Sequence, residues 1–152
     1  MVEYVWLKFF HVLIAIIALG TSAGLGIVME FYGDHPVHGL FVLRAVKRLV
    51  FFVVFPGFLL MVATGLWLTH EAWSFTFAWI QAALVLWVLG AIAFGGSLVF
   101  LNKQIALFEA SGPTSESYKR VSSWGRFFGG ASGLTIVIIV YVMVAKPSLA
   151  WW

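Results

Sequence analysis

The chain of 152 residues contains no cysteine, and only 10% of its residues are charged. Without thiolates it forms no disulfide, no thiolate metal site, no iron–sulfur cluster and no covalent c-type haem linkage. Soluble domains carry roughly 25% charged residues, so this composition does not suit a water-soluble fold. With 62% hydrophobic residues and a mean hydropathy of +1.03, the chain is expected to be embedded in a membrane.

Runs without any charged residue locate the membrane spans. They cover residues 9–29, 49–69, 72–102 and 127–145. Each run is long enough to cross a hydrocarbon core of ~30 Å, which takes about 20 helical residues. Backbone groups cannot stay unpaired in lipid, so the spans are helices. The sequence therefore predicts an all-α polytopic membrane protein, a four-transmembrane-helix bundle in one domain over residues 1–152, with spans at about 4–30, 40–69, 75–102 and 124–146.

The distribution of positive charge predicts the orientation. Seven of the nine lysines and arginines fall in segments 30–48 and 102–126. The positive-inside rule places these two segments in the cytoplasm of a bacterial-type inner membrane and both termini outside. We do not expect the first apolar run to be a cleaved signal peptide, because it is too long and follows Glu3 as well as Lys8.

His11 is the most informative residue, because an ionisable side chain within a membrane span is a functional hypothesis by default. Stepping 100° per residue along a helix puts Ala15, Ala18 and Ser22 within about 40° of it. These small side chains leave room for a flat group above the imidazole. Lys8 lies near the interface, where it could contact an acidic group of a cofactor.

From the residues alone, two interpretations of His11 stay open. It can hydrogen-bond to another helix as a purely structural group, or it can be an axial ligand of haem in the bundle. His70 ends the second span on the same side of the membrane and is the candidate second metal ligand; the alternatives are a group from a partner subunit or a vacant position. The alternative role of His70 is an interfacial residue beside Glu71.

The connections contain cap and break signals. Pro36 is expected to begin the second helix with Asp34 as its cap, and Ser115 or Thr114 is expected to cap the fourth. Pro56 falls within a span and should kink it, because it removes a backbone hydrogen bond.

Glycines indicate close helix packing. Gly20 and Gly24 form a G-x-x-x-G pattern that is typical of helix–helix contacts in membranes, and Gly90, Gly95 and Gly96 make the third span thin. We expect a homodimer packed through such faces.

The ends of the chain resemble a known family. Trp6-Leu7-Lys8-Phe9-Phe10-His11-Val12 is similar to the W-[IL]-K-x-[LF]-H-[IV] start of the four-helix protoporphyrinogen oxidases and their relatives. Val142-Met143-Val144-Ala145-Lys146-Pro147 is similar to their hydrophobic-Lys-Pro ending. The relatives include CopD-like domains and a family of predicted integral membrane proteins of unassigned function. The resemblance implies a b-type haem with His11 as ligand, and often a homo-oligomer.

The resemblance does not carry the oxidase activity over safely. That enzyme's third helix begins with W-x-H-x-K, whereas the matching stretch here is Trp79-Ile80-Gln81-Ala82-Ala83, without the histidine or the lysine.

Hydrolase, nucleotide-binding and nucleic-acid functions lack any supporting motif. We therefore expect a haem b-binding membrane protein that serves electron transfer or haem-dependent redox chemistry, with a quinone as a candidate redox partner. The alternatives are a membrane subunit or assembly factor in which His11 is structural, a protoporphyrinogen oxidase-like enzyme, and a copper-handling protein. Whether the chain is an enzyme stays open.

Overall fold

The computed structural model describes residues 2–147, and within them the chain consists of helices and short connections. The first and last spans are each one helix, whereas the second is divided by a short π-helical segment. The elements are α1 (Val2–Tyr32), α2 (Gly39–Leu49), η1 (Val50–Val54), α3 (Phe55–Ala72), α4 (Ala78–Ser111) and α5 (Glu116–Ala145).

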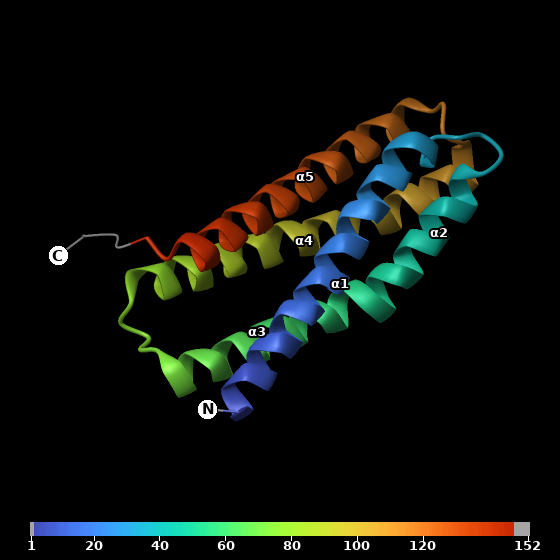
Figure 1. Ribbon diagram of the computed structural model, residues 1–152. Helices are drawn as coiled ribbons and strands as arrows, with labels where there is room; N and C mark the ends of the chain where they lie inside the picture. The colour runs from blue at the N-terminus through green and yellow to red at the C-terminus, as the bar shows by residue number, and fades with distance from the viewer. Residues whose placement is uncertain (1, 148–152) are drawn as a thin grey trace.

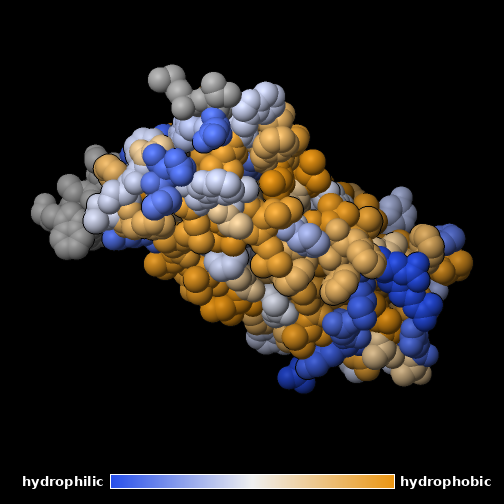
Figure 2. Space-filling model, turned by 90° about the horizontal axis from the view of Figure 1, so that it is seen from below, coloured by the Kyte–Doolittle hydropathy of each residue, from blue (hydrophilic) through white to orange (hydrophobic). Residues whose placement is uncertain are grey.

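Four of the helical stretches between residues 2 and 147 are long and apolar enough to cross a membrane: Glu3–Tyr32, Gly39–Ala72, Ala78–Ser111 and Glu116–Ala145. Their outer surfaces carry large hydrophobic side chains, such as Phe52 at 72% exposure and Ile92 at 65%. Figure 2 shows a largely hydrophobic surface with hydrophilic residues gathered towards the two ends. Such a surface suits contact with lipid rather than with water, and the predicted all-α class is confirmed.

The helices form two pairs that diverge. Helix α4 packs along α5 and α1 packs along α3, whereas α1 and α5 touch each other little. The pairs meet at the end that holds the α1–α2 and α4–α5 connections, and they open towards the end where α1 begins and α5 finishes (Figure 1). This divergence leaves space between α1 and α5.

The second span is irregular just before Pro56, where the sequence predicts a kink. Residues Val50–Val54 form a π-helical turn, and α3 follows with the proline in its first turn. The proline ring clashes with the carbonyl four residues earlier in a regular α-helix. A wider turn at this point accommodates the ring and keeps the span continuous.

The closed end of the bundle is fixed by Tyr118. Its fully buried side chain donates a hydrogen bond to the Gly33 carbonyl over 2.9 Å and packs edge-on against the Phe108 ring. Gly39 lies in the same place, where a Cβ would come within 2.6 Å of the Gly33 oxygen and 2.7 Å of the Phe108 ring. Only glycine fits at this position. The α1–α2 and α4–α5 connections can therefore pack closely against Phe108 of α4.

Two predictions about helix starts are wrong and one is confirmed. Helix α2 begins at Gly39 rather than near Pro36, and His38 occupies its cap position without a side-chain hydrogen bond. Asp34 is not its cap but lies 3.7 Å from Arg126 of α5. Ser115 does cap α5, because its hydroxyl accepts a hydrogen bond from the Tyr118 amide over 3.3 Å.

Glycines bring the paired helices together at some positions only. A Cβ at Gly96 would meet the Phe128 ring at 2.7 Å, and one at Gly57 would meet the Ala18 Cβ at 2.6 Å. A Cβ at Gly20, Gly24 or Gly95 would meet nothing within 4 Å. The first two glycines therefore serve packing within the chain, and the other three do not.

Candidate functional site

His11 lies on the face of α1 that packs against α3. Its Nδ1 is 2.8 Å from the Thr64 hydroxyl oxygen. That hydroxyl is also 2.7 Å from the Leu60 carbonyl and 3.2 Å from the Met61 carbonyl, one turn earlier in α3. The histidine is thus tied to the second span through a threonine.

The contacts of Thr64 favour one tautomer of His11. A hydroxyl has one proton, and Thr64 can donate it to a carbonyl of its own helix. In that arrangement the hydroxyl accepts a hydrogen bond from Nδ1, and the lone pair is on Nε2. Metal-binding histidines use the same arrangement, in which one ring nitrogen donates to a neighbour and the other is left for the metal.

The missing side chain at Gly65 makes room for the imidazole of His11. A Cβ at this position would come within 3.2 Å of His11 Cε1, so the ring lies on the surface that the glycine leaves bare. Thr64 and Gly65 are adjacent, and one orients the ring while the other makes room for it.

A mostly apolar cavity of about 440 Å³ adjoins His11. Its volume lies within the range of roughly 300–1,000 Å³ that is usual for ligand sites. The lining side chains come from α1, α3, α4 and α5, and several are small, among them Ala15, Gly20, Gly65, Ala83 and Gly90. Space for a ligand of ordinary size therefore exists beside the imidazole.

One polar atom in the cavity wall has no partner. The indole nitrogen of Trp87 is buried and makes no hydrogen bond to any of the described residues. An unpaired buried donor costs about 1–3 kcal/mol. Because the nitrogen itself is buried, a bound molecule could accept this hydrogen bond only after the indole turns towards the cavity.

The structure separates the residues that the sequence grouped with His11. Ala15 lines the cavity. Ala18 is only 1% exposed and packs against Gly57. Ser22 lines a second cavity, and Lys8 is exposed and contributes to neither. Ala15, Ala18 and Ser22 share one face of α1 with His11, but each turn of that face meets a different neighbouring group.

His70 is exposed at the end of α3 and does not line the cavity with His11. The described residues contain no group of three or more His, Asp or Glu side chains that could hold a metal ion. A metal site built from several such ligands is therefore not available, and binding of iron by His11 and His70 stays a prediction that this geometry does not favour.

Two potential metal ligands in the cavity were not predicted. Met61 of α3 and Met143 of α5 both line it, and thioethers bind haem iron and copper(I). Met143 lies inside the Val-Met-Val-Ala-Lys-Pro ending, where a methionine among aliphatic residues gives no sign of its direction. For Met61, the only indication in the sequence is its position one turn before Thr64 in the same helix.

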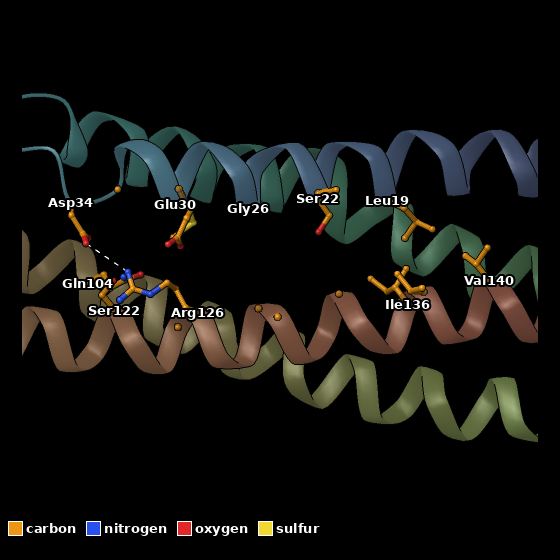
Figure 3. A pocket seen from close by; sticks show the side chains of 18 residues that line it. Leu19, Ser22, Gly26, Glu30, Asp34, Gln104, Ser122, Arg126, Ile136 and Val140 are labelled. Atoms are coloured by element: carbon orange, nitrogen blue, oxygen red, sulfur yellow. Dashed lines mark ion pairs between the residues drawn. The ribbon is translucent and has the colours of Figure 1, made fainter.

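A second cavity of about 590 Å³ lies between α1 and α5. Figure 3 shows Asp34, Glu30, Gln104, Ser122 and Arg126 at one end of it and Leu19, Ile136 and Val140 at the other. These three apolar residues line the cavity beside His11 too. The two cavities therefore adjoin within the space between the diverging helix pairs.

Residues 5–147 match a family model described as "Predicted integral membrane protein (DUF2269)". The chain belongs to this family. No curated protein and no solved structure matches it. Membership of DUF2269 confirms the expected kinship with predicted integral membrane proteins, whereas nothing found links the chain to the protoporphyrinogen oxidases or to CopD-like domains.

Proposed function

We propose that this DUF2269 protein binds haem b through His11 and transfers electrons in the membrane. The observation that carries the proposal is an imidazole on the wall of an apolar cavity, with Nδ1 already engaged by Thr64 over 2.8 Å. The other ring nitrogen is then the natural metal ligand of the cavity.

The residues of the cavity fit the chemistry of haem. A porphyrin is flat and apolar except at its two carboxylates, and the wall is apolar with small side chains where bulk would block entry. Met61 and Met143 provide thioethers, which are known sixth ligands of haem iron.

The chain's own residues hold and isolate such a group. His11 would supply the axial nitrogen, and Thr64 keeps the imidazole in the tautomer that leaves this nitrogen free. The surrounding aliphatic side chains give the imidazole an apolar setting. Haem, when bound, supplies one-electron redox chemistry with the axial ligands setting its potential.

We also propose the orientation that the charge pattern predicts. Seven lysines and arginines lie towards the end where the helix pairs meet, so this end faces the cytoplasm under the positive-inside rule. His11 and its cavity then lie in the outer half of an inner membrane. Both described ends of the chain lie at the outer surface.

A second function has its own supporting observation. The contacts of His11 with Thr64 and Gly65 form a complete interhelical connection without any ligand. In this alternative His11 is structural glue, and the protein is a subunit or assembly factor.

Haem content separates the two functions. Wild type, His11→Ala, Gly20→Leu and Gly24→Leu are purified in mild detergent from cells supplied with haem precursor, and haem is measured by the pyridine haemochrome method. Gly20 lines the cavity and Gly24 does not, and a Cβ added at either position meets nothing within 4 Å. We expect stoichiometric haem in wild type and Gly24→Leu and loss of haem in His11→Ala and Gly20→Leu.

Two outcomes would overturn the proposal. Wild type that stays free of haem but folds normally would leave His11 as a structural residue. Copper without porphyrin, lost on replacement of His11, would point to a thioether and imidazole copper site instead.

A further inference from the structure

The cavity between α1 and α5 has a polar end and an apolar arm. Glu30 projects from α1 and Arg126 from α5 into the space between the helices, with Asp34 joined to the arginine (Figure 3). Leu19, Ile136 and Val140 line the other end. The polar end and the apolar arm therefore match the head group and the tail of an amphiphilic molecule.

Near the polar end, the side-chain oxygen of Gln104 has no hydrogen-bond partner. Its side chain comes from α4 and is only 3% exposed, and its Oε1 makes no hydrogen bond to any residue in the range 2–147. The oxygen lies beside Gly125, where a Cβ would be 3.4 Å away. The oxygen itself is buried, but the Gln104 side chain lines the cavity, so a rotation of this side chain would bring the oxygen to a bound donor.

The charges at this end are unequal. Asp34 and Arg126 lie 3.7 Å apart, whereas Glu30 makes no ion pair within the described part of the chain. Two carboxylates and one guanidinium leave a net charge of −1. The site therefore suits a head group that has a hydrogen-bonding cation and also an anionic part for Arg126.

The apolar arm has the depth of one leaflet. Glu30 and Leu19 are eleven residues apart on α1, which is about 16 Å of helix and roughly half of the ~30 Å hydrocarbon core. Gly129, Gly130 and Gly133 line the arm on α5, and a Cβ on any of them would meet nothing within 4 Å. An acyl chain can therefore lie along α5 without displacing any side chain.

We propose that this cavity binds one phospholipid with a primary ammonium head group, of the ethanolamine class. Its ammonium donates to Gln104 Oε1 and Glu30, its phosphate pairs with Arg126, and one acyl chain follows the glycines of α5. A choline head group has the same charges but no N–H, so it cannot satisfy Gln104. The proposal does not rest on haem binding.

Lipid selectivity tests this inference. Full-length protein is reconstituted in nanodiscs of equal parts phosphatidylethanolamine and phosphatidylcholine and then released for native mass spectrometry, in which retained lipids are counted. Gly133→Leu fills the cavity, and Gly95→Leu is its matched control, since Gly95 is equally free of neighbours but lines neither cavity. We expect one retained ethanolamine lipid in wild type and Gly95→Leu, and none in Gly133→Leu.

Gln104→Leu distinguishes a ligand site from a packing defect. The substitution removes the unpaired oxygen, so the lipid-free protein should unfold at a higher temperature, while affinity for the ethanolamine lipid falls about tenfold for the lost hydrogen bond. Glu30→Gln should reduce the preference over choline lipid, and Glu3→Gln, exposed on the same helix, should not.

Equal retention of both lipids in wild type would overturn the proposal. So would retention that Gly133→Leu leaves unchanged, or a quinone found as the retained molecule in place of the lipid. Haem is measured in the same samples, and lipid retention is repeated with His11→Ala. The lipid result can therefore be interpreted even if no haem is bound, and the haem result can be interpreted even if no lipid is retained.

Discussion

Replacing Gly57 by alanine should separate the two helices that place His11. The added Cβ would come within 2.6 Å of the Ala18 Cβ, whereas carbon atoms pack best at about 3.5–4.0 Å. Helix α3 must therefore move away from α1 by about 1 Å. Neither methyl group can turn aside, so backbone movement is the only relief.

The expected cost follows from overpacking. Extra atoms in a packed interior cost about 1–3 kcal/mol, and the better helix propensity of alanine over glycine returns about 0.5–1 kcal/mol. We expect a net loss of up to about 2 kcal/mol in the free energy of unfolding. At Gly24, where a Cβ meets nothing within 4 Å, the same substitution should be neutral or slightly stabilising.

The measurement is reversible unfolding in mixed micelles, followed by circular dichroism, for Gly57→Ala, Gly24→Ala, Ala18→Gly and the double variant Ala18→Gly/Gly57→Ala. The double variant exchanges the two residues across the interface and removes the clash, so it should recover most of the stability lost in Gly57→Ala. If Gly57→Ala proves as stable as Gly24→Ala, or if the exchange rescues nothing, the α1–α3 contact described here is wrong.

Three further predictions concern other contacts. Tyr118→Phe leaves the Gly33 carbonyl without its 2.9 Å hydrogen bond and should lower the free energy of unfolding by about 1–3 kcal/mol; an unchanged stability would refute this role. Lys146→Met removes the ammonium that lies 4.1 Å from the Trp73 ring centroid and should cost about 0.5–1 kcal/mol in the same unfolding assay. Since the chain has no cysteine, Val37→Cys and Phe75→Cys each introduce the only thiol. An impermeant maleimide on intact cells should label Phe75→Cys alone, and the opposite pattern would invert the proposed orientation.

The membrane spans could be predicted because their cause is local. Charge-free runs and the backbone's need for hydrogen bonds fix four helices without reference to tertiary contacts. The irregularity before Pro56 has an equally local cause in the proline ring, although it takes the form of a π-helical turn, which the sequence did not predict. The Ser115 cap was predictable for the same reason, since it depends only on residues within one turn.

The failures involve partners that are distant in the sequence. Asp34 has the chemistry of a helix cap, but Arg126 of α5 lies near it and the chain instead starts α2 at Gly39. Ala18 does point in nearly the same direction as His11, yet Gly57 of another helix covers it. A helical wheel gives directions on one helix and says nothing about which neighbour is there.

Of the residues that line the candidate site, only His11 and its helix neighbour Ala15 were predicted. A histidine within an apolar run stands out, whereas Met143 and Trp87 lie in stretches of α5 and α4 that are hydrophobic on every side and show no periodic signal. Their meeting in one cavity depends on the divergence of the two helix pairs. That divergence depends on the whole set of interhelical contacts, which no segment encodes alone.

The optical spectrum of purified protein tests the central claim most directly, recorded as isolated and after dithionite. The proposal predicts a Soret band in the wild type that shifts and sharpens on reduction, with α and β bands typical of b-type haem. Replacement of His11 by alanine should abolish these bands while circular dichroism still shows a folded helical protein. A colourless wild type from haem-replete cells, or a spectrum unaffected by His11→Ala, would contradict the claim that this cavity is a haem site.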